Sequence, residues 1–167
     1  GRTGCGLCGT ESLGQVRRAL PAALPAVSLM PGVPGLALRA LREHQARQAL
    51  TGAVHAAAWC DRDGRILLLR EDIGRHNALD KLAGAMRRAQ ADPGQGWVLV
   101  TSRASFEMVQ KSAMIGAGLL VAVSAPTTAA VDLARQCGLA LAGFARGDDF
   151  VAYAGPERLG LTPLADC

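Results

Sequence analysis

Apolar residues occur along most of the chain in two alternating kinds of block. From residue 53 onward, short and nearly continuous apolar runs alternate with stretches in which apolar residues recur every three or four positions. The first pattern is typical of buried strands and the second of amphipathic helices. The predicted strands are 53–60, 65–69, 97–101, 119–124, 139–144 and 150–153. The predicted helices are 36–50, 76–91, 105–117 and 127–137.

The order and character of these blocks predict an α/β fold. The first two strands flank Asp61-Arg62-Asp63-Gly64, whose Asp-Gly pair favours a hairpin turn. The later strands, such as 119–123, are apolar throughout, which is typical of strands covered on both faces by helices. We therefore expect a three-layer α/β sandwich with a mixed, mainly parallel sheet and an antiparallel hairpin at its edge.

The first 34 residues do not follow this pattern. Residues 1–15 are rich in glycine and show no period, and four prolines in residues 16–34 exclude a long helix there. We divide the chain into a cysteine-loop and proline-rich segment, residues 1–34, and an α/β domain, residues 35–167. The chain begins at Gly1 directly before a cysteine motif, so we expect a preceding N-terminal region to be missing.

Composition restricts the possible classes of protein. A length of 167 residues suits one domain, and 50% hydrophobic with 19% charged residues argues against disorder. The longest apolar run, 113–123, is shorter than the roughly 18 residues of a spanning helix, and no secretory signal precedes it. We therefore expect no membrane association and a cytoplasmic location.

The charge is mildly basic and scattered. The chain has 18 Lys+Arg against 14 Asp+Glu, and its basic residues form no run longer than a pair. This argues against nucleic-acid binding. An anionic small ligand or an acidic partner fits the balance better.

Cys5-Gly6-Leu7-Cys8 is the sharpest local motif. Two thiols at this spacing can exchange disulfides, bind a metal or carry sulfur as a persulfide. The other cysteines and the three histidines lack paired ligand spacing, so we expect no metal site. The flanking glycines disfavour the helix start of a thioredoxin-type site and suit a thiol on a moving loop. Sulfur transfer or redox chemistry is favoured, with metal binding and inert loop cysteines as alternatives. Cys60 and Cys137 lie in apolar segments and are interpreted as core residues.

Polar segments follow the predicted strands, where open α/β sheets bind their ligands. Three of these segments carry an arginine (Arg75, Arg103 and Arg146), and three precede helix starts, whose N–H groups favour phosphate. This predicts a phosphorylated or nucleotide-like ligand, although loops at strand ends are commonly polar in α/β proteins. The candidate cofactor-binding residues here are Arg75, His76, Asn77, Arg103, Ser105, Ser124 and Thr127.

His76 is a candidate proton donor or acceptor near neutral pH. The alternative is that its polar neighbours only cap a helix and form ion pairs between residues four apart. Pairs with that spacing are His76–Asp80, Asn77–Lys81 and Glu107–Lys111. His44 and His55 have no visible partner and are interpreted as surface or packing residues. Phe106, Phe150 and Tyr153 can stack a base, but aromatic residues are more often core.

Four motifs together resemble the FdhD family of formate dehydrogenase accessory sulfurtransferases. The likeness runs from Cys5 to about Arg158 in the same order. Its motifs are CGLCG at 5–9, EDIGRHNALDK at 71–81, SFEMVQK at 105–111 and VSAPT at 123–127. Some positions depart from the family pattern. Thr101-Ser102-Arg103 replaces Ser-Gly-Arg, and Asp149, Val151 and Ala154 replace Arg, Asn and Thr.

The resemblance implies a function, a fold and partners. Family members accept sulfur from a cysteine desulfurase as a persulfide and pass it to the molybdenum of the bis(molybdopterin guanine dinucleotide) cofactor of formate dehydrogenase. The resemblance also implies a domain with a fold like that of cytidine deaminase, although this sequence lacks the zinc signature of that enzyme. It further implies a homodimer that acts on the formate dehydrogenase apoenzyme.

The resemblance also implies roles for residues. Cys5 is the persulfide cysteine and Cys8 its partner. The implied cofactor-binding stretch is Phe150, Val151, Ala152, Tyr153, Ala154 and Gly155. We therefore expect a sulfur carrier. Two alternatives remain, a cofactor-binding chaperone that carries no sulfur and a thiol–disulfide or zinc protein.

Overall fold

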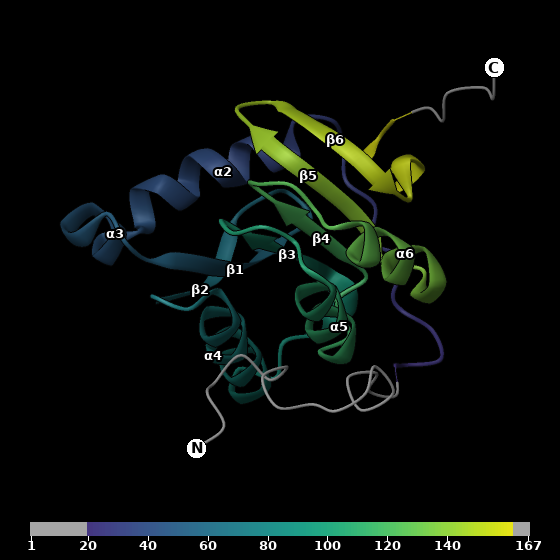
Figure 1. The fold of residues 1–167 in the computed structure, drawn as a ribbon, viewed down its shortest axis with the longest axis horizontal. Helices are drawn as coiled ribbons and strands as arrows, with labels where there is room; N and C mark the ends of the chain where they lie inside the picture. The colour runs from purple at the N-terminus through teal and green to yellow at the C-terminus, as the bar shows by residue number, and fades with distance from the viewer. Residues whose placement is uncertain (1–19, 162–167) are drawn as a thin grey trace.

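Six strands form one mixed sheet in the computed structural model, which describes residues 20–161. The sheet has the order β2-β1-β3-β4-β5-β6 (Figure 1). The strands are β1 (His55–Asp61), β2 (Ile66–Asp72), β3 (Gly96–Val100), β4 (Leu119–Ala122), β5 (Ala140–Arg146) and β6 (Asp149–Ala154). β3, β4 and β5 are parallel, whereas the β1–β2, β1–β3 and β5–β6 pairs are antiparallel. The sheet is mixed as predicted, but its parallel part is confined to the centre because a hairpin closes each side.

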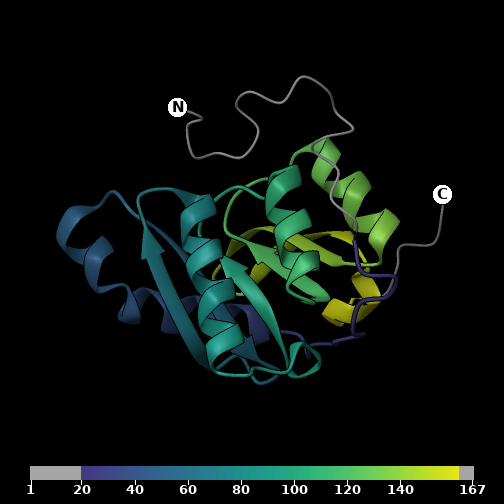
Figure 2. The same cartoon turned by 90° about the horizontal axis from the view of Figure 1, so that it is seen from below.

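Helices cover both faces of the sheet. The helices are α2 (Val33–His44), α3 (Ala46–Thr51), α4 (Arg75–Arg88), α5 (Phe106–Met114) and α6 (Thr128–Cys137), with short 3-10 turns η1 (Pro93–Gln95) and η2 (Pro156–Leu159). α4, α5 and α6 lie on one face and α2 lies on the other (Figures 1 and 2). The three-layer α/β sandwich is confirmed. The likeness to cytidine deaminase stays a prediction.

The two layers of helix create two hydrophobic cores, one on each face. In β1, Ala57 and Trp59 pack toward α4, while Ala56, Ala58 and Cys60 pack toward α2. All five residues of β3 and all four of β4 are buried. This explains the continuous apolar runs in the sequence, because a strand covered on both faces gains from apolar side chains at every position.

The predicted helix 36–50 is two helices in the structure. α2 ends and α3 begins at Gln45, which leaves helical geometry with φ −83° and ψ 71°. The carboxylate of Glu71 in β2 accepts hydrogen bonds from the backbone N–H groups of Arg47 and Gln48, at 3.0 and 3.1 Å. This caps the start of α3 from another part of the chain. A contact between distant residues thus accompanies a helix boundary that local periodicity does not predict.

The proline-rich stretch packs against the domain. Val27 and Leu29 are buried in the core on the α2 side, and α2 already begins at Val33 with Pro34 in its first turn. Proline is tolerated there because the first helical N–H groups have no partner within the helix. The described part of segment 1–34 therefore contributes to the core.

Arg158 of η2 joins separate segments at the edge of the sheet where β4 and β5 begin. Its guanidinium donates hydrogen bonds of 2.8–2.9 Å to four backbone carbonyls. The acceptors belong to Pro25, Val27, Gly118 and Gly138. Bonds from a charged donor to several carbonyls are stronger than neutral ones. Arg158 therefore anchors the N-terminal stretch to the sheet.

We expect Arg158→Ala to lower the free energy of unfolding by about 3 kcal/mol, because four carbonyls lose a charged donor. Arg158→Lys should restore only part of this, since an ammonium cannot reproduce the guanidinium fork. Urea denaturation measures the effect, with Arg42→Ala on the exposed side of α2 as the control. Equal effects of Arg158→Ala and Arg42→Ala would contradict the anchoring role.

Candidate functional site

One edge of the sheet gathers most of the predicted binding residues. β3, β4 and β5 are parallel, so their carboxyl ends meet at this edge, where β2 also ends and β1 begins. Val123 N–H donates to the carbonyl of Val100 and Thr127 N–H to that of Ala104, both at 3.0 Å. These bonds join the loops after β3 and β4, and the loop after β2 lies at the same edge of the sheet. We call the three loops the strand-end rim and define it by residues 72–76, 101–105 and 123–127.

The start of α4 is held by a network around Asp72. Its Oδ1 accepts hydrogen bonds from the Gly74 N–H at 2.9 Å and from the Asn77 side-chain amide at 3.3 Å, and Oδ2 pairs with Lys81. The Lys81 ammonium and the Gly74 N–H lower the pKa of Asp72 to about 2. The polar motif is therefore partly structural, and the Asn77 amide is engaged inside the chain.

His76 and Arg75 follow directly and carry unpaired buried atoms. His76 is only 9% exposed, and neither its Nε2 nor Arg75 Nε has a hydrogen-bond partner within the described residues. Burial and the Arg75 charge hold the pKa of His76 below 6.5, while the charges of Glu107 and Asp80 act in the opposite direction. Buried polar atoms without partners are rare and costly, so this pair is the strongest local sign of a ligand site.

The predicted ion pairs between residues four apart are not the ones the structure forms. Lys111 donates to both carboxylate oxygens of Asp80, at 2.6 Å, and so joins α5 to α4 instead of pairing with Glu107. Lys81 pairs with Asp72 instead of with Asn77. The helices pack side by side, which brings together charges that are far apart in the sequence.

Other predicted rim residues differ in what their side chains do. Arg103 is exposed on the loop after β3. Ser105 precedes the first residue of α5 and makes no side-chain capping bond there. Thr127 caps α6, because its hydroxyl oxygen accepts the Ala130 N–H at 3.2 Å. Ser124 follows β4, and its carbonyl accepts the Phe144 N–H at 3.3 Å.

The predicted stretch 150–155 does not lie at one place. β6 begins beside the rim, so Phe150 lies at that edge, packed toward the α2 side. Val151 is exposed and Ala152 packs toward the α2 side. Ala154 is buried beside Leu141, and Gly155 lies near Ala140 at the opposite edge of the sheet.

Tyr153 approaches the rim by a different route. A Cβ atom at Gly143 would collide with Pro126 and make a tight contact, 3.2 Å, with Cε2 of Tyr153, so this ring lies close to the loop after β4. The absence of a side chain at position 143 therefore lets an aromatic ring of β6 approach the rim. The structure brings Phe150 and Tyr153 near the rim and places Ala154 and Gly155 away from it.

Sequence reasoning missed two residues that lie beside the strand-end rim, His55 and Phe144. His55, interpreted from the sequence as a surface or packing residue, begins β1 beside the rim, where burial and the Arg75 charge lower its pKa. With Thr101 it lines a pocket of about 400 Å³. Phe144 has φ 52° and is 44% exposed beside Ser124, an unusual state for an aromatic residue. A strand pattern alone reveals neither feature.

Two of the four cysteines discussed from the sequence lie within the described residues. Cys5 and Cys8 lie outside the described residues. Cys60 is fully buried, and burial raises the pKa of its thiol, so it is a core residue as predicted. Cys137 is partly buried at the end of α6, where burial also raises its pKa. Within residues 20–161, no group of three His, Cys, Asp or Glu side chains is arranged to hold a metal ion.

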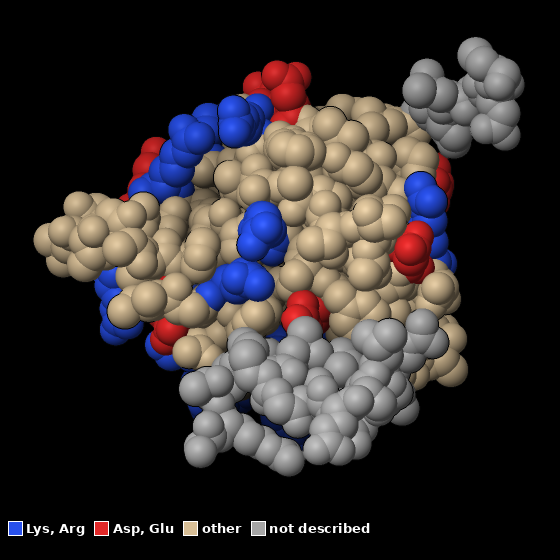
Figure 3. Space-filling view, in the orientation of Figure 1, with Lys and Arg blue, Asp and Glu red and all other residues tan. Residues whose placement is uncertain are grey.

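Positive charge is scattered on the face seen in Figure 3. Lys and Arg side chains lie in separate groups, including a row over α2, on a surface that is otherwise mostly uncharged. No described helix is long and apolar enough to cross a membrane. The geometry therefore defines a class of protein, a three-layer α/β domain whose strand-end rim offers cations, hydroxyl groups and helix starts to an anionic ligand.

The chain belongs to the FdhD/NarQ family, whose sequence profile matches residues 1–160. It is 54% identical to the sulfur carrier protein FdhD of Bordetella petrii and 55% to that of Variovorax paradoxus, over 98% of this chain and 59% of each relative. It is 58% identical to the corresponding protein of Cupriavidus necator, over 95% of this chain and 55% of that relative.

A solved structure shows the same fold. The crystal structure of a candidate formate dehydrogenase accessory protein from Desulfotalea psychrophila matches with a TM-score of 0.76 and 29% identity, covering 83% of this chain and 59% of that one. The family expected from the motifs is confirmed. The chain spans 55–59% of the length of these three curated relatives.

The lowered pKa of His76 predicts a pH dependence of stability. Below 6.5 the unfolded chain binds a proton at this position more readily than the folded chain does. The contribution of His76 is therefore fully present above about pH 6.5 and is lost as the pH falls through that value toward the folded pKa. Stability should decrease from about pH 7.5 to about pH 5.5, and His76→Gln should reduce that decrease.

Urea denaturation at both pH values measures this effect, and an NMR titration of the imidazole measures the pKa directly. His44→Gln is the control, because His44 lies exposed on α2 away from the rim. An imidazole that titrates above 6.5 would contradict the assignment.

Proposed function

We propose that this chain is a sulfurtransferase that carries sulfur for the activation of formate dehydrogenase. Cys5 accepts sulfur from a cysteine desulfurase and Cys8 assists its release to the molybdenum of the bis(molybdopterin guanine dinucleotide) cofactor, the client of the carrier. The proposal includes a homodimer in the cytoplasm that acts on the formate dehydrogenase apoenzyme. The observation that carries it is the strand-end rim, in a chain whose relatives are named sulfur carrier proteins.

The first step is a thiol exchange. The Cys5 thiolate attacks the outer sulfur of the persulfide on the desulfurase, a new S–S bond forms on Cys5, and the old one breaks to leave the desulfurase thiolate. The exchange has no net oxidation or reduction. For release, the Cys8 thiolate attacks the inner sulfur on Cys5, forms a disulfide and expels hydrosulfide. A thiol reductant then restores the pair.

The strand-end rim supports the second part of the proposal, binding of the guanine dinucleotide cofactor. A guanine dinucleotide carries a pyrophosphate, and guanidinium groups and helix N-termini are its usual partners. Arg75 and Arg103 lie on the rim, and α5 and α6 begin there. His76 and Arg75 each have a buried nitrogen without a partner in the described residues, which a phosphate oxygen satisfies. The rings of Phe150 and Tyr153 are candidates for stacking on the base.

Mass spectrometry after incubation with a cysteine desulfurase and free cysteine tests the carrier step. We expect an added sulfur on Cys5 that a reductant removes. Cys5→Ala should abolish both this addition and formate dehydrogenase maturation, whereas Cys8→Ala should retain the addition and slow release. Cys137→Ala is the matched control, since that thiol is partly buried in α6. Maturation that survives the loss of both Cys5 and Cys8 would favour a chaperone that carries no sulfur.

Binding of guanosine diphosphate tests the rim separately. We expect Arg103→Ala to weaken binding about tenfold, the usual effect of removing one charged hydrogen-bonding partner of a phosphate. Arg42→Ala on α2 should leave the affinity unchanged. Isothermal titration calorimetry measures both. If the two variants bind equally well, the rim is not the nucleotide site.

A further inference from the structure

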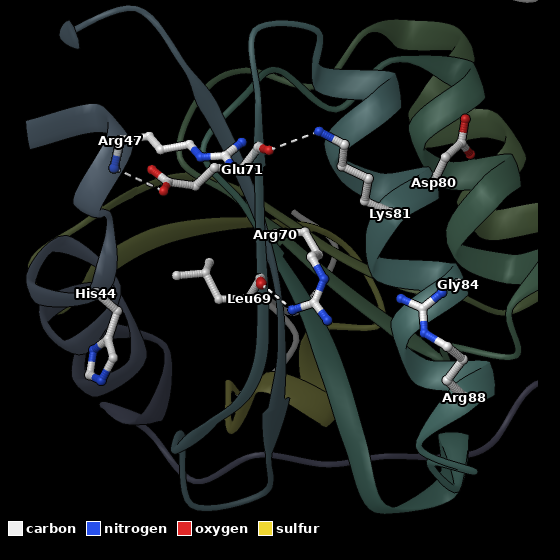
Figure 4. A pocket seen from close by; sticks show the side chains of 9 residues that line it. All are labelled: His44, Arg47, Leu69, Arg70, Glu71, Asp80, Lys81, Gly84 and Arg88. Carbon is white, nitrogen blue, oxygen red and sulfur yellow. Dashed lines mark hydrogen bonds between the residues drawn. The ribbon is translucent and has the colours of Figure 1, made fainter. Parts of the chain in front are cut away.

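A second hollow of the described residues lies outside the strand-end rim. It is a trough of about 680 Å³ along the free edge of β2, with α3 and the end of α2 on one side and α4 on the other (Figure 4). Its four basic side chains are Arg47, Arg70, Lys81 and Arg88. Its two acidic side chains are Glu71 and Asp80. We call it the β2 trough.

The acidic groups of the β2 trough are already paired. The Glu71 carboxylate accepts the N–H groups of Arg47 and Gln48, and the Asp80 carboxylate accepts both bonds from Lys111. By contrast, the guanidinium groups of Arg47 and Arg88 form no hydrogen bond or ion pair with another residue of the range 20–161. The trough therefore presents an excess of hydrogen-bond donors, which favours a ligand made of acceptors.

The floor of the trough is an unpaired sheet edge. The backbone groups of successive residues in a strand point to opposite sides. The N–H and carbonyl groups of Ala56 bond to Thr101 on the β3 side, so those of Ala57 point toward its partner Arg70 in β2. The backbone groups of Leu69 and Glu71, on either side of Arg70, therefore point away from β1. Their outward carbonyls accept bonds from Arg70 Nη1 at 2.6 Å and from Lys81 Nζ at 3.3 Å.

Arg70 and Lys81 therefore occupy the outward carbonyls of β2 that an added strand would use. A neutral strand that paired with β2 would have to displace both cations from the carbonyls. Lys81 would keep its ion pair with Asp72, but the charge of Arg70 would be left poorly satisfied. An acidic strand offers Arg70 a carboxylate in exchange. The Leu69 and Glu71 carbonyls are then free to accept N–H groups of the incoming strand.

We propose that the β2 trough binds an extended acidic segment of a partner protein, which adds to the sheet beside β2. A second copy of this chain fits less well, because two troughs with an excess of positive charge would face each other. A single small anion also fits less well, because the cations lie along both walls and the floor instead of converging on one point (Figure 4).

The test uses the 167-residue chain and two eight-residue peptides, one alternating threonine and glutamate and one alternating threonine and glutamine. At low salt, roughly 50 mM, we expect the glutamate peptide to bind at least about tenfold more tightly. Backbone amide exchange should slow at Leu69 and Glu71 on binding. Equal affinities, or binding that leaves both amides unchanged, would overturn the proposal.

Arg88→Glu and Arg87→Glu form a matched pair of variants. Both arginines are exposed in the last turn of α4, so both substitutions disturb the helix end equally, but only Arg88 lines the trough. We expect Arg88→Glu to weaken peptide binding about tenfold and Arg87→Glu to have no such effect. If both variants weaken binding alike, general charge attraction explains it and the docking site is refuted.

Gly84→Leu provides a second test that retains the charges. Gly84 lines the trough on α4, and an added Cβ would meet only Arg88 Nη1, at 3.8 Å. Leucine favours the helix more than glycine does, so the fold should tolerate it. We expect the bulky side chain to weaken peptide binding. Unchanged affinity would place the peptide elsewhere.

Two controls test the alternative occupants of the β2 trough, a second copy of the chain and a small anion. Sedimentation of the chain alone detects a second copy, and a dimer that Arg88→Glu dissociates would overturn the proposal. Inorganic pyrophosphate is the small-anion probe. Pyrophosphate binding that depends on Arg88, without binding of the glutamate peptide, would also overturn it. The sulfur-transfer assay with Cys5→Ala is independent of both, so the two proposals fail separately.

Discussion

The burial of both faces of the central strands is the constraint on which the rest of the structure depends. β3 and β4 are apolar at every position and expose almost nothing, so helices have to cover the sheet on both sides. α5 connects β3 to the parallel strand β4, and α6 connects β4 to β5. Parallel strands joined in this way place the loop after each strand at the same edge. The core thereby determines where a binding site can form.

The strand-end rim and the residues beside it contain unpaired buried atoms and an unfavourable backbone conformation. Buried Arg75 Nε and His76 Nε2 lack partners in the described residues, and Phe144 takes a backbone conformation that disfavours its side chain. Each feature costs stability. Two cores and the Arg158 anchor at the opposite edge supply the stability that lets the rim retain them. Departures of this kind are concentrated where a ligand is expected to bind.

The β2 trough and the strand-end rim are different kinds of surface. The rim combines loops, helix starts and buried unpaired atoms, a combination that suits a compact anion. The trough is an open sheet edge whose outward carbonyls are covered by Arg70 and Lys81. α4 contributes to both, since it begins at the rim with Arg75 and forms one wall of the trough near Arg88. The proposed cofactor site and the proposed docking site therefore use different surfaces and do not compete.

The sequence by itself determined the family, the alternation of strands and helices and the three layers, because those depend on local periodicity and on contiguous motifs. It also placed Arg75, Arg103 and the starts of α5 and α6 at one edge, since topology follows from that alternation. Only the tertiary structure decided that Glu71 caps α3, that Asp80 pairs with Lys111, that His55 lies beside the rim and that 150–155 spans the sheet. Each of these depends on which strands are neighbours and in what register, and a single sequence does not encode such long-range pairing in any local pattern.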